Sequence, residues 1–518
     1  MKKEEIIKIL NEHPNYRKKL FCRGFLVTDD EALKLDGYPF YGMWKEERYG
    51  RHRVISHPQE NTVWNNTYCL IGHAFNPIRG IKDEQKILRD IADKETSQDK
   101  YEYINELTGV FILLKLEEKG LSFLADAVGL QSVFYSYSDT ENYYVSSHSN
   151  LIGDILNLQK DSYITDLSNA KYFRLFGNQL PGNLTQFLEV KRYVPNHVVY
   201  INGNVTERRF YWPHTLNLSK SEIEAELVDF LCASMELISQ KWVKPAISLT
   251  GGCDSKTTLA CAMETKGSYL YFSYDSQKNE VPDAEAAKKI CNALYLKHLL
   301  YTIPYSDDEI PDIDIIRAII SWNCGNITPN NKIDVRKRAF LDTTKDFDIE
   351  VKSWVSEIGR SRYTKRYAGR KNFGSKPSPR VCTTFYKFLF FNRVLVNKTD
   401  KVFKDYLNAF FEMDKSNPIP WQDQFYWEWH WPSRDGITLT GEQRYSNDIT
   451  VPYNNRRILE LLLSMPEEDR IKDIAYSDIR KILCPKIDDT CKNIVDLNHT
   501  PLRANLENLY YLMNTHLP

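Results

Sequence analysis

The sequence predicts an α/β protein with two unlike halves, and three observations carry that prediction. The chain has 518 residues, which is enough for two to four domains of about 100–200 residues each. Residues from about 20 to 212 contain short aromatic and β-branched runs bounded by Asn, Asp, Gly or Ser, a pattern typical of strands. From about 218 onward, strand-like and helix-like segments alternate, which indicates a parallel sheet covered by helices.

The first half is expected to be mostly strand. Five runs fit this description, and they begin near Gly109, Leu121, Ser132, Asn142 and His197. The segment DEQKILRDIADK, from Asp83, has the apolar spacing of a helix and interrupts them. We therefore expect a sheet-rich domain over about residues 1–215.

A long helix opens the second half. Its sequence, SKSEIEAELVDFLCASMELISQKW, has apolar residues at helical spacing, and Ser221 followed by Glu224 predicts a capping box at its start. The strand patterns PAISLT, SYLYFSYD and LKHLLYTI follow, separated by helices from about Lys256 and Asp283. The remainder, from about residue 310, has mainly helical patterns, so a second domain is expected over residues 216–518.

The composition excludes several classes of partner. The formal net charge is −1 and the isoelectric point is about 6.8, whereas a nucleic-acid-binding domain carries a basic excess. The ten cysteines form no C-x-x-C pair, which argues against a zinc site and suits a reducing cytoplasm. The amino terminus lacks the apolar region of a signal peptide, and no apolar run is long enough to span a bilayer. We therefore expect a cytoplasmic protein without a nucleic-acid or membrane partner.

The most informative segment is the loop that follows the strand pattern PAISLT. It runs T-G-G-C-D-S from Thr250 to Ser255 and leads into a helix pattern. Glycines let the backbone approach a phosphate chain closely, and a helix amino terminus offers unpaired N–H groups to it. Ser255 can donate to a phosphate oxygen, and Asp254 can hold Mg²⁺. The Walker pattern G-x-x-x-x-G-K-[ST] is absent, and an ordinary strand–Gly-Gly–helix turn is the alternative.

This segment resembles the S-G-G-x-D-S pyrophosphate loop of the PP-loop ATP pyrophosphatases in its asparagine synthetase form, with Thr250 in place of the first serine. The D-x-E-A-A pattern from Asp283 and the run from Val451 to Arg456 extend the resemblance over nearly the whole chain. It implies a PP-loop synthetase domain with a parallel sheet and many helices, which uses Mg·ATP. The implied ATP-binding residues, of which Asp254 is also the magnesium ligand, are Ser248, Leu249, Thr250, Gly251, Gly252, Asp254, Ser255, Phe272, Ser273 and Ser356.

The first half resembles the glutaminase domain of the same family in outline. Leu107 to Phe111 is similar to its L-x-G-x-F strand, and Ala125 to Leu130 to its R-D-x-x-G-I pattern. Tyr144 to Ser147 and Val194 to His197 are similar to its Y-F-A-S and P-P-G-H segments. The resemblance implies an Ntn-hydrolase-like αββα sandwich.

The chemistry of that glutaminase does not carry over to this chain. The glutaminase needs cysteine as its mature first residue, because the free α-amine serves as its base. Here Lys2 follows the initiating methionine, and I-G-H from Ile71 to His73 replaces the N-G-E that holds glutamine. We therefore expect no glutamine hydrolysis, and we expect Cys22 and His73 to be core residues.

Two further positions depart from the family pattern. The best match to its S-G-E-G-x-D-E motif begins at Ser356, which puts Glu357 on the catalytic glutamate and Arg360 on a metal-binding aspartate. An arginine at that position could pair with pyrophosphate directly. Tyr476 stands where amide-forming members have lysine, and Lys472, one helical turn earlier, is a candidate substitute. The catalytic candidates are therefore Glu357, Arg360 and Lys472.

The implied activity is AMP-forming synthesis of an amide bond without glutamine hydrolysis, as in β-lactam synthetases and lasso-peptide cyclases. The expected partners are a carboxylate substrate, an amine donor, ATP and Mg²⁺, and a homodimer is compatible with the resemblance. The alternatives are a nucleotide-binding protein that has lost turnover and a PP-loop tRNA-modifying enzyme. The neutral charge and the missing C-x-x-C disfavour the last.

Two segments have no role that the resemblance assigns. Residues 360–380 carry eight Arg or Lys and no acid, so they predict either a solvated loop or a lid that closes over an anion. Residues 421–431 hold six aromatic side chains. We expect these mostly in the core, with an aromatic wall for a substrate as the alternative.

Overall fold

Two antiparallel sheets form the amino-terminal half of the computed structural model, which describes residues 2–137, 142–170, 173, 179–325, 332–387, 392–493 and 500–516. The first sheet contains, in spatial order, β10 (Lys191–Arg192), β8 (Phe134–Tyr137), β9 (Tyr143–Ser146), β1 (Phe25–Thr28), β3 (His52–Ser56) and β2 (Lys45–Tyr49). The second contains β12 (Val205–Arg209), β11 (His197–Ile201), β7 (Gly120–Ala125), β6 (Thr108–Glu117), β5 (Tyr68–Phe75) and β4 (Thr62–Trp64).

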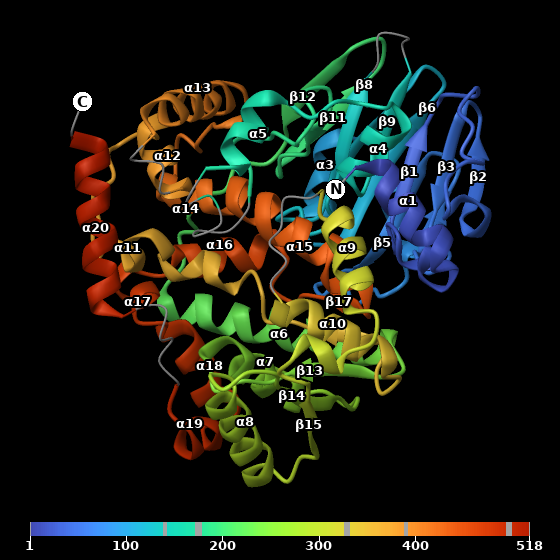
Figure 1. Ribbon diagram of the computed structural model, residues 1–518. Helices are drawn as coiled ribbons and strands as arrows, with labels where there is room; N and C mark the ends of the chain where they lie inside the picture. Colours follow the sequence, from blue (N-terminus) through green and yellow to red (C-terminus); the bar gives the residue numbers. More distant parts are fainter. Residues whose placement is uncertain are drawn as a thin grey trace.

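Helices cover the outer faces of these two sheets. On the second sheet, α2 (Glu84–Ala92) packs against β4 and β5 and is followed by α3 (Ser97–Asn105). On the first sheet, α4 (Ser149–Ile155) packs against β8 and β9 (Figure 1). One apolar core joins side chains of both sheets, with Val27 and Val145 on one side and Ile112 and Leu114 on the other. The order helix, sheet, sheet, helix confirms the predicted αββα sandwich.

The carboxy-terminal half contains a parallel sheet, as predicted. Its spatial order is β15 (His298–Thr302), β14 (Leu270–Asp275), β13 (Pro245–Ser248), β16 (Ile349–Val351) and β17 (Asp448–Thr450). The chain leaves β13 toward β14 on one side and later returns to β16 on the other side. The carboxyl end of β13 is therefore a point where the strand order reverses, which is where open α/β sheets bind ligands.

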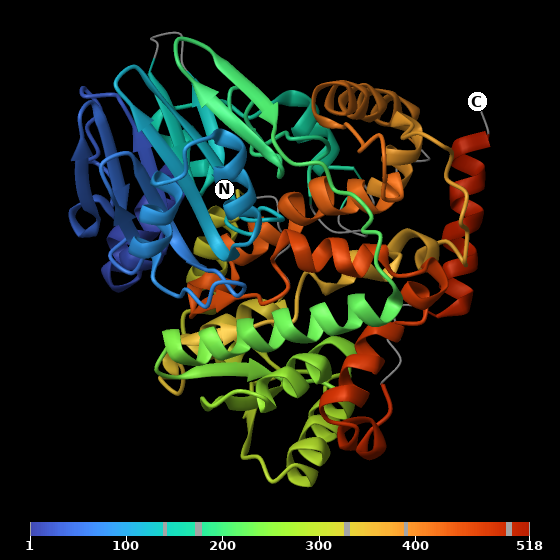
Figure 2. The same cartoon turned by 180° about the vertical axis from the view of Figure 1, so that it is seen from behind.

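Many helices surround this sheet and fill the space up to the sandwich (Figure 1). The helices of this half are α6 (Lys220–Lys241), α7 (Cys253–Met263), α8 (Val281–Ala293), α9 (Ile313–Asn323), α10 (Lys332–Thr343), α11 (Arg362–Arg366), α12 (Pro379–Tyr386), α13 (Arg393–Phe410), α14 (Trp421–Phe425), α15 (Ile437–Gly441), α16 (Arg456–Ser464), α17 (Glu467–Ile471), α18 (Ile474–Leu483), α19 (Lys486–Thr490) and α20 (Pro501–His516). In the first half, α1 (Lys3–Glu12) and α5 (Ser162–Ser168) complete the set. The long helix α6 packs against α7, α16 and α18, and Figure 2 shows it in green across the lower half of the molecule.

Three sequence predictions need correction. The capping box of α6 uses Ser219 and Glu222, two residues before the predicted pair, because Ser219 is the residue with extended backbone before the helix. Helix α7 begins at Cys253 rather than near Lys256, because Gly252 has the extended conformation of an N-cap. The strands β16 and β17 lie in the region predicted as helical, since three-residue strands give too few residues for a periodic signal.

A buried polar seam joins the two halves. Asn454, just after β17, donates to the carbonyl of Gly109 (2.6 Å) and to Asp126 Oδ1 (2.9 Å). The indole of Trp427 donates to the carbonyl of Ala127 (2.8 Å). Asn454, Gly109, Asp126 and Ala127 belong to segments that carried the sequence resemblance. That resemblance therefore covers residues at the contact between the two halves as well as residues within each half. The proposed boundary at residue 215 falls between β12 and α6.

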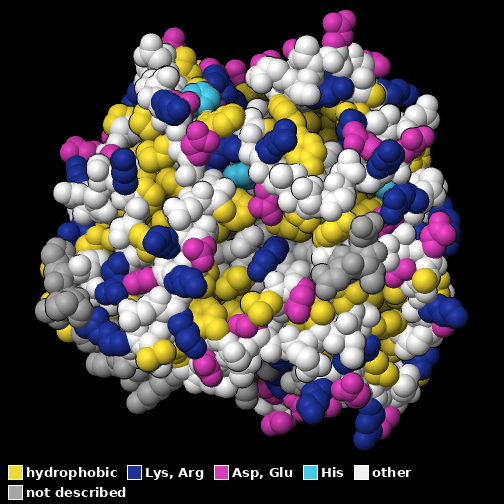
Figure 3. Space-filling model, turned by 90° about the horizontal axis from the view of Figure 1, so that it is seen from above, with side chains coloured by type: hydrophobic (Ala, Val, Ile, Leu, Met, Phe, Trp, Pro, Cys, Tyr) yellow, Lys and Arg dark blue, Asp and Glu magenta, His cyan; other side chains and the backbone are white. Residues whose placement is uncertain are grey.

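The surface gives two further observations. On the face that Figure 3 shows, basic and acidic side chains are interspersed rather than gathered by sign. Across the described ranges of the chain, no helix combines the length and the apolar character that crossing a membrane requires.

Candidate nucleotide-binding site

The loop after β13 is held in shape by its own hydroxyl groups. The Ser255 hydroxyl accepts from the amide of Thr250 (3.1 Å), and the Thr250 hydroxyl accepts from the amide of Gly252 (3.1 Å). The two hydroxyls are 2.9 Å apart, and the amide of Gly251 donates to Asp283 (2.8 Å). The first amides of α7 have no side-chain cap. The arrangement is a preformed turn that leads into an uncapped helix amino terminus at the reversal point of the sheet.

Helix α7 is fixed from its other side by charged groups of the carboxy-terminal helices. Arg480 donates through Nη1 to the carbonyl of Cys253 (3.1 Å) and to the Thr257 hydroxyl (2.8 Å). Lys256, which is fully buried, pairs with Asp488 at 3.0 Å. These contacts explain why the helix start, and with it the loop, has a defined position.

The strand β14 borders the loop, as the sequence predicted, but the two residues implied there behave differently. The amide of Leu249 donates to the carbonyl of Phe272 (2.7 Å), and the Ser273 hydroxyl donates to the carbonyl of Leu249 (2.8 Å). The ring of Phe272 is fully buried and stacks on Phe347, with centroids 5.2 Å apart. Its side chain is therefore not available to a nucleotide. Contact with an adenine through this strand stays a prediction for its backbone and for Ser273.

Four charged side chains meet at the mouth of the loop, and we call them the ionic quartet: Asp254, Arg360, Lys365 and Asp473. Arg360 binds Asp473 through two parallel hydrogen bonds, from Nε and Nη2, each 2.8 Å long. Its Nη1 donates to Asp254 Oδ2 at 2.7 Å. Lys365 also donates to Asp473, at 2.6 Å. The sequence predictions had named Asp254 and Arg360 as site residues and Lys365 as part of the basic segment, but had missed Asp473.

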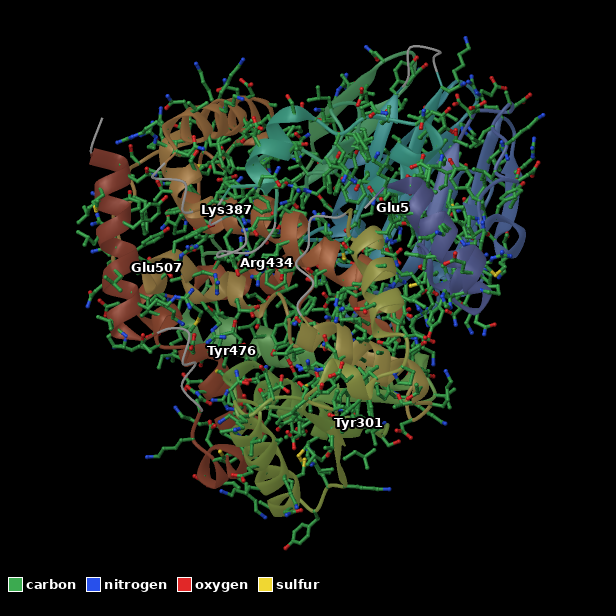
Figure 4. All side chains as sticks on the ribbon, viewed as in Figure 1. Glu5, Tyr301, Lys387, Arg434, Tyr476 and Glu507 are labelled. Atoms are coloured by element: carbon green, nitrogen blue, oxygen red, sulfur yellow. The ribbon has the colours of Figure 1, made fainter. Side chains whose placement is uncertain are left out.

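The two departures from the family pattern meet at this quartet. The guanidinium of Arg360 lies over the ring of Tyr476, with 5.8 Å between its Cζ and the ring centroid. The Tyr476 hydroxyl donates to the carbonyl of Ser356 (2.6 Å), and its own carbonyl lies 3.4 Å from the Thr257 hydroxyl. Figure 4 shows Tyr476 just above the parallel sheet, beside the start of α7. The guanidinium of Arg360 thus lies beside position 476, where the resemblance led us to expect a lysine.

Lys472 makes no side-chain hydrogen bond or ion pair with the quartet in the described part of the chain, and its role as a catalytic cation stays a prediction. Its side chain is exposed at the end of α17, whereas the next residue, Asp473, has a left-handed backbone (φ 59°) and reaches Arg360. The helical-turn argument that proposed Lys472 assumed one continuous helix, but α17 ends at Ile471 and α18 starts at Ile474.

Burial and charge set the protonation of the acids around the loop. Burial raises the pKa of Asp254, and the adjacent guanidinium of Arg360 opposes this only in part. Burial, with the charge of Asp254 beside it, raises the pKa of Glu357 to about 7. Burial would also raise the pKa of Asp473, but the hydrogen bonds and charges of Arg360 and Lys365 hold it below its ordinary value. Glu357 is therefore the acid of this group that changes charge near neutral pH.

The neighbouring residues in the same motif differ in how well they are partnered. Ser356 is fully buried, and its hydroxyl donates to the carbonyl of Ser353 (3.0 Å). Glu357 Oε2 and Asp254 Oδ1 are both buried without a hydrogen-bond partner in the described part of the chain. Of the predicted motif, Glu357 thus has an unsatisfied oxygen, while Ser356 is held within its own turn.

The fit of a magnesium ion to these residues is poor. One oxygen of Asp254 is already bound by Arg360, and the position implied for a second carboxylate ligand holds that same arginine. In the ranges that the structure describes, no group of three or more His, Cys, Asp or Glu side chains is arranged to hold a metal. Mg²⁺ takes oxygen ligands in near-octahedral geometry, and a guanidinium beside them repels it. Arg360 therefore disfavours Asp254 as a magnesium ligand, and that role stays a prediction.

The basic segment 360–380 consists of α11, an irregular and largely exposed stretch over residues 368–376, and the start of α12. Several of its cations have partners from distant parts of the chain. Arg366 pairs with Glu507 on α20, and Arg380 pairs with Asp400 on α13 (2.7 Å). The solvated loop is therefore confirmed only for the middle of the segment, and a lid over an anion stays a prediction. Figure 4 shows Glu507 on α20, at the edge of the molecule.

The aromatic run and the former glutaminase residues lie in the core, as predicted. All six aromatic side chains between Trp421 and Trp431 are buried, in α14 and the π-helical segment that continues it, residues 426–436. Cys22 and His73 are buried too. Burial raises the pKa of the Cys22 thiol, although Lys19, Arg23 and Arg444 nearby act in the opposite direction. A buried thiol of this kind lacks the thiolate that a nucleophile needs.

No protein-family model matches the chain, and no curated protein is similar to it at a significant level. Several solved structures are similar in part, and three of them follow. One is the allosteric regulatory enzyme of purine biosynthesis, at 12% identity over 51% of this chain and 62% of that chain, with a TM-score of 0.22. The second is glutamine-dependent NAD+ synthetase from Acinetobacter baumannii, at 14% identity over 32% and 34%, with a TM-score of 0.18. The third is glutamine phosphoribosylpyrophosphate amidotransferase from B. subtilis, at 9% identity over 70% and 74%, with a TM-score of 0.21.

This chain therefore spans less than two thirds of the length of the first two of these proteins. At such TM-scores the likenesses carry no weight for function. The fold assignment rests on the sheets and helix layers described above.

Proposed function

We propose that this protein is an ATP-dependent, AMP-forming synthetase that joins a carboxylate to an amine without hydrolysing glutamine. One observation carries the proposal. The loop from Thr250 to Ser255 lies at the reversal point of a parallel sheet, opens onto an uncapped helix, and has two cations at its mouth. A turn of backbone amides with a helix dipole and nearby cations suits a polyphosphate.

The chemistry would proceed in two balanced steps. A carboxylate oxygen of the substrate attacks the α-phosphorus of ATP, the bond from that phosphorus to the bridging oxygen breaks, and pyrophosphate leaves. The amine nitrogen then attacks the acyl carbon of the adenylate, and AMP leaves with the electron pair of the broken C–O bond. The amine loses one proton in this second step, so a base is needed next to the loop.

Glu357 is the residue that we assign to this proton. Its raised pKa of about 7 is near the operating range of a general base, and one of its oxygens has no partner among the described residues. The charge of Asp254 raises the pKa of Glu357, and the charge of Arg360 lowers it. Arg360 and Lys365 would stabilise negative charge on the departing pyrophosphate.

The source of the amine follows from the first half of the chain. Cys22 is buried, and the amide of Phe21 before it donates to Asn323 (2.8 Å), so the segment ahead of Cys22 is packed into the fold. A buried thiol with a peptide bond in front of it cannot act as an amino-terminal nucleophile. The amine would therefore be free ammonia, a separate amine, or an amine within the substrate.

The test of the proposal is nucleotide binding followed by product identity. Calorimetric titration with ATP should show binding to the wild type and a loss of roughly tenfold in affinity for Ser255→Ala, since one hydrogen bond to a charged oxygen is removed. Ser162→Ala, on an exposed position of α5, is the matched control and should bind as the wild type does. Incubation with mixed carboxylic acids and amines should yield AMP rather than ADP. Equal affinity for all three proteins would contradict the assignment of the loop.

A second candidate is a nucleotide-binding protein without turnover, and one observation favours it. Arg360 holds Asp254 and Asp473 together across the mouth of the loop, so the quartet is already neutralised internally. Such a protein would bind ATP with the same dependence on Ser255. It would form neither AMP nor pyrophosphate with any acid and amine.

A further inference from the structure

The guanidinium of Arg360 is held in a fixed position by neighbouring side chains, unlike a mobile cation on the protein surface. Its guanidinium has five N–H groups, and three of its nitrogens each make one bond to the acids of the quartet. Each terminal nitrogen, Nη1 and Nη2, therefore keeps a second N–H. Its side chain is 22% exposed, so the group is accessible from the mouth of the loop while its position is fixed by three hydrogen bonds.

The surroundings of Arg360 hold this cation in one orientation. The ring of Tyr476 lies beneath the guanidinium, and a hydroxyl–carbonyl bond to Ser356 locks that ring. Lys365 provides a second positive charge on the same acid, Asp473. Two cations thus lie beside the turn of amides from Thr250 to Ser255, where the phosphates of a nucleotide would be bound.

A divalent cation has no comparable place in this site. Two carboxylate oxygens at the site, Asp254 Oδ1 and Glu357 Oε2, are buried without a partner in the described residues, and the first belongs to a carboxylate that Arg360 already binds. A protein-held ion would compete with the guanidinium for one acid and would be repelled by it. The residues fit a fixed organic cation better than a bound metal.

We propose that this site binds the polyphosphate of a nucleotide without a protein-held divalent cation, with Arg360 and Lys365 supplying the positive charge. This inference rests on the proposed function, because it concerns the same loop. The ligand it names is metal-free ATP, whose phosphates are more negative than those of the magnesium complex and suit a pair of cations better. The residue at position 360 would then determine whether ATP binding requires Mg²⁺.

The experiment compares ATP affinity in excess Mg²⁺ with ATP affinity in excess EDTA. The wild type should bind in both, with dissociation constants that differ by no more than about threefold. Arg360→Asp should lose roughly 100-fold in EDTA, because one charged contact is removed and a negative charge is added. Added Mg²⁺ should recover at least about tenfold of that loss, since the introduced carboxylate and Asp254 together would offer oxygen ligands to an ion. Arg360→Lys should keep metal-free binding within about tenfold of the wild type.

A matched control and a second variant keep the result decisive. Arg48→Asp makes the same charge change on an exposed residue of β2, and it should behave as the wild type does. Should Arg360→Asp fail to fold by circular dichroism, Arg360→Gln answers the same question, with loss in EDTA and no recovery by Mg²⁺. ATP binding by the wild type only in Mg²⁺ overturns the inference and leaves the proposed function standing. Wild-type binding that Arg360→Asp or Arg360→Gln leaves unchanged overturns it too, whereas no ATP binding under either condition removes the proposed function itself.

Discussion

Two ionic networks in this protein look alike in chemistry but differ in burial. The ionic quartet at the loop has side chains that are 20–26% exposed. A second network, which we call the seam cluster, consists of Arg23, Glu60, Gln131, Arg444 and Asp448 and lies between the two halves. In it, Arg444 is fully buried and Glu60 is 1% exposed. Arg444 donates to Glu60, to Gln131 (3.0 Å) and to Asp448 (3.0 Å).

The difference in burial separates a structural network from one that can take a ligand. The charges of Arg444 and Glu60 are compensated only by their neighbours in the seam cluster, because both side chains are sealed from solvent, and losing one leaves the other buried and unpaired. Burial raises the pKa of Glu60 to about 7, although Arg444 opposes it. The quartet remains in contact with solvent, so an anion can reach its cations without first being desolvated completely.

The largest expected effect is on stability, from Arg444→Met. This change leaves Glu60 and Asp448 without their main partner in a poorly solvated interior and should lower the free energy of unfolding by about 3–5 kcal/mol. Arg360→Met, the matched change in the quartet, should cost less, roughly 1–3 kcal/mol, because the acids left behind are only partly buried. Urea unfolding of both variants measures the difference. Equal losses would show that burial does not distinguish the two networks.

The next largest effect is expected on ATP affinity, for the variant Arg360→Ala. Removing a charged contact to the β- or γ-phosphate should weaken ATP binding by roughly 10- to 100-fold. AMP lacks those phosphates and should bind the variant and the wild type alike. Calorimetry with both nucleotides decides this. Loss of AMP and ATP binding together points to a disturbed fold, and loss of neither leaves the quartet without a role in binding.

How far the sequence predicts these two networks depends on the range of the contacts. The turn from Thr250 to Ser255 and the helix after it are local, so the residue pattern predicts both the element and its phosphate-binding chemistry. The contact between Asp254 and Arg360 spans 106 residues, and that between Glu60 and Arg444 spans 384. The family resemblance placed Asp254 and Arg360 at one site, but no periodicity or motif placed Glu60 beside Arg444.

The basic segment illustrates the same limit. Its sequence shows many cations and no acid, which correctly describes its local charge but not its environment. Glu507 on α20 and Asp400 on α13 supply the acids. Asp473 of the quartet was missed for this reason, since nothing in the sequence placed an acid beside Arg360 and Lys365.

A smaller effect should appear as a pH dependence from Glu357. Its pKa in the folded protein, about 7, lies above its ordinary value of 4.5. Between these values the folded state keeps a proton that the unfolded state has lost, so the contribution of Glu357 to stability falls as the pH rises through this window. Glu357→Gln does not titrate and should be more stable than the wild type by about 3 kcal/mol at pH 8, but not at pH 4.

The matched control for that titration is Glu118→Gln, an exposed residue after β6. Thermal unfolding at pH 4, 6 and 8 should give parallel curves for this control and the wild type. Parallel curves for Glu357→Gln as well would mean that the pKa of Glu357 is the same in the folded and the unfolded protein, and its assignment as a base near neutral pH would be withdrawn.

The smallest expected effect concerns Cys22, beside the seam cluster. Its thiol donates to the carbonyl of Arg444 (3.4 Å), and burial raises its pKa, so it is not a nucleophile at neutral pH. Glutamate release from glutamine should not exceed the background, and Cys22→Ala should leave that background and the ATP affinity unchanged. The variant should lose only about 1 kcal/mol of stability, as expected for a small buried side chain. Glutamate release by the wild type that Cys22→Ala abolishes would mean that the seam opens in solution, and the contrast between a sealed network and an accessible one would no longer hold.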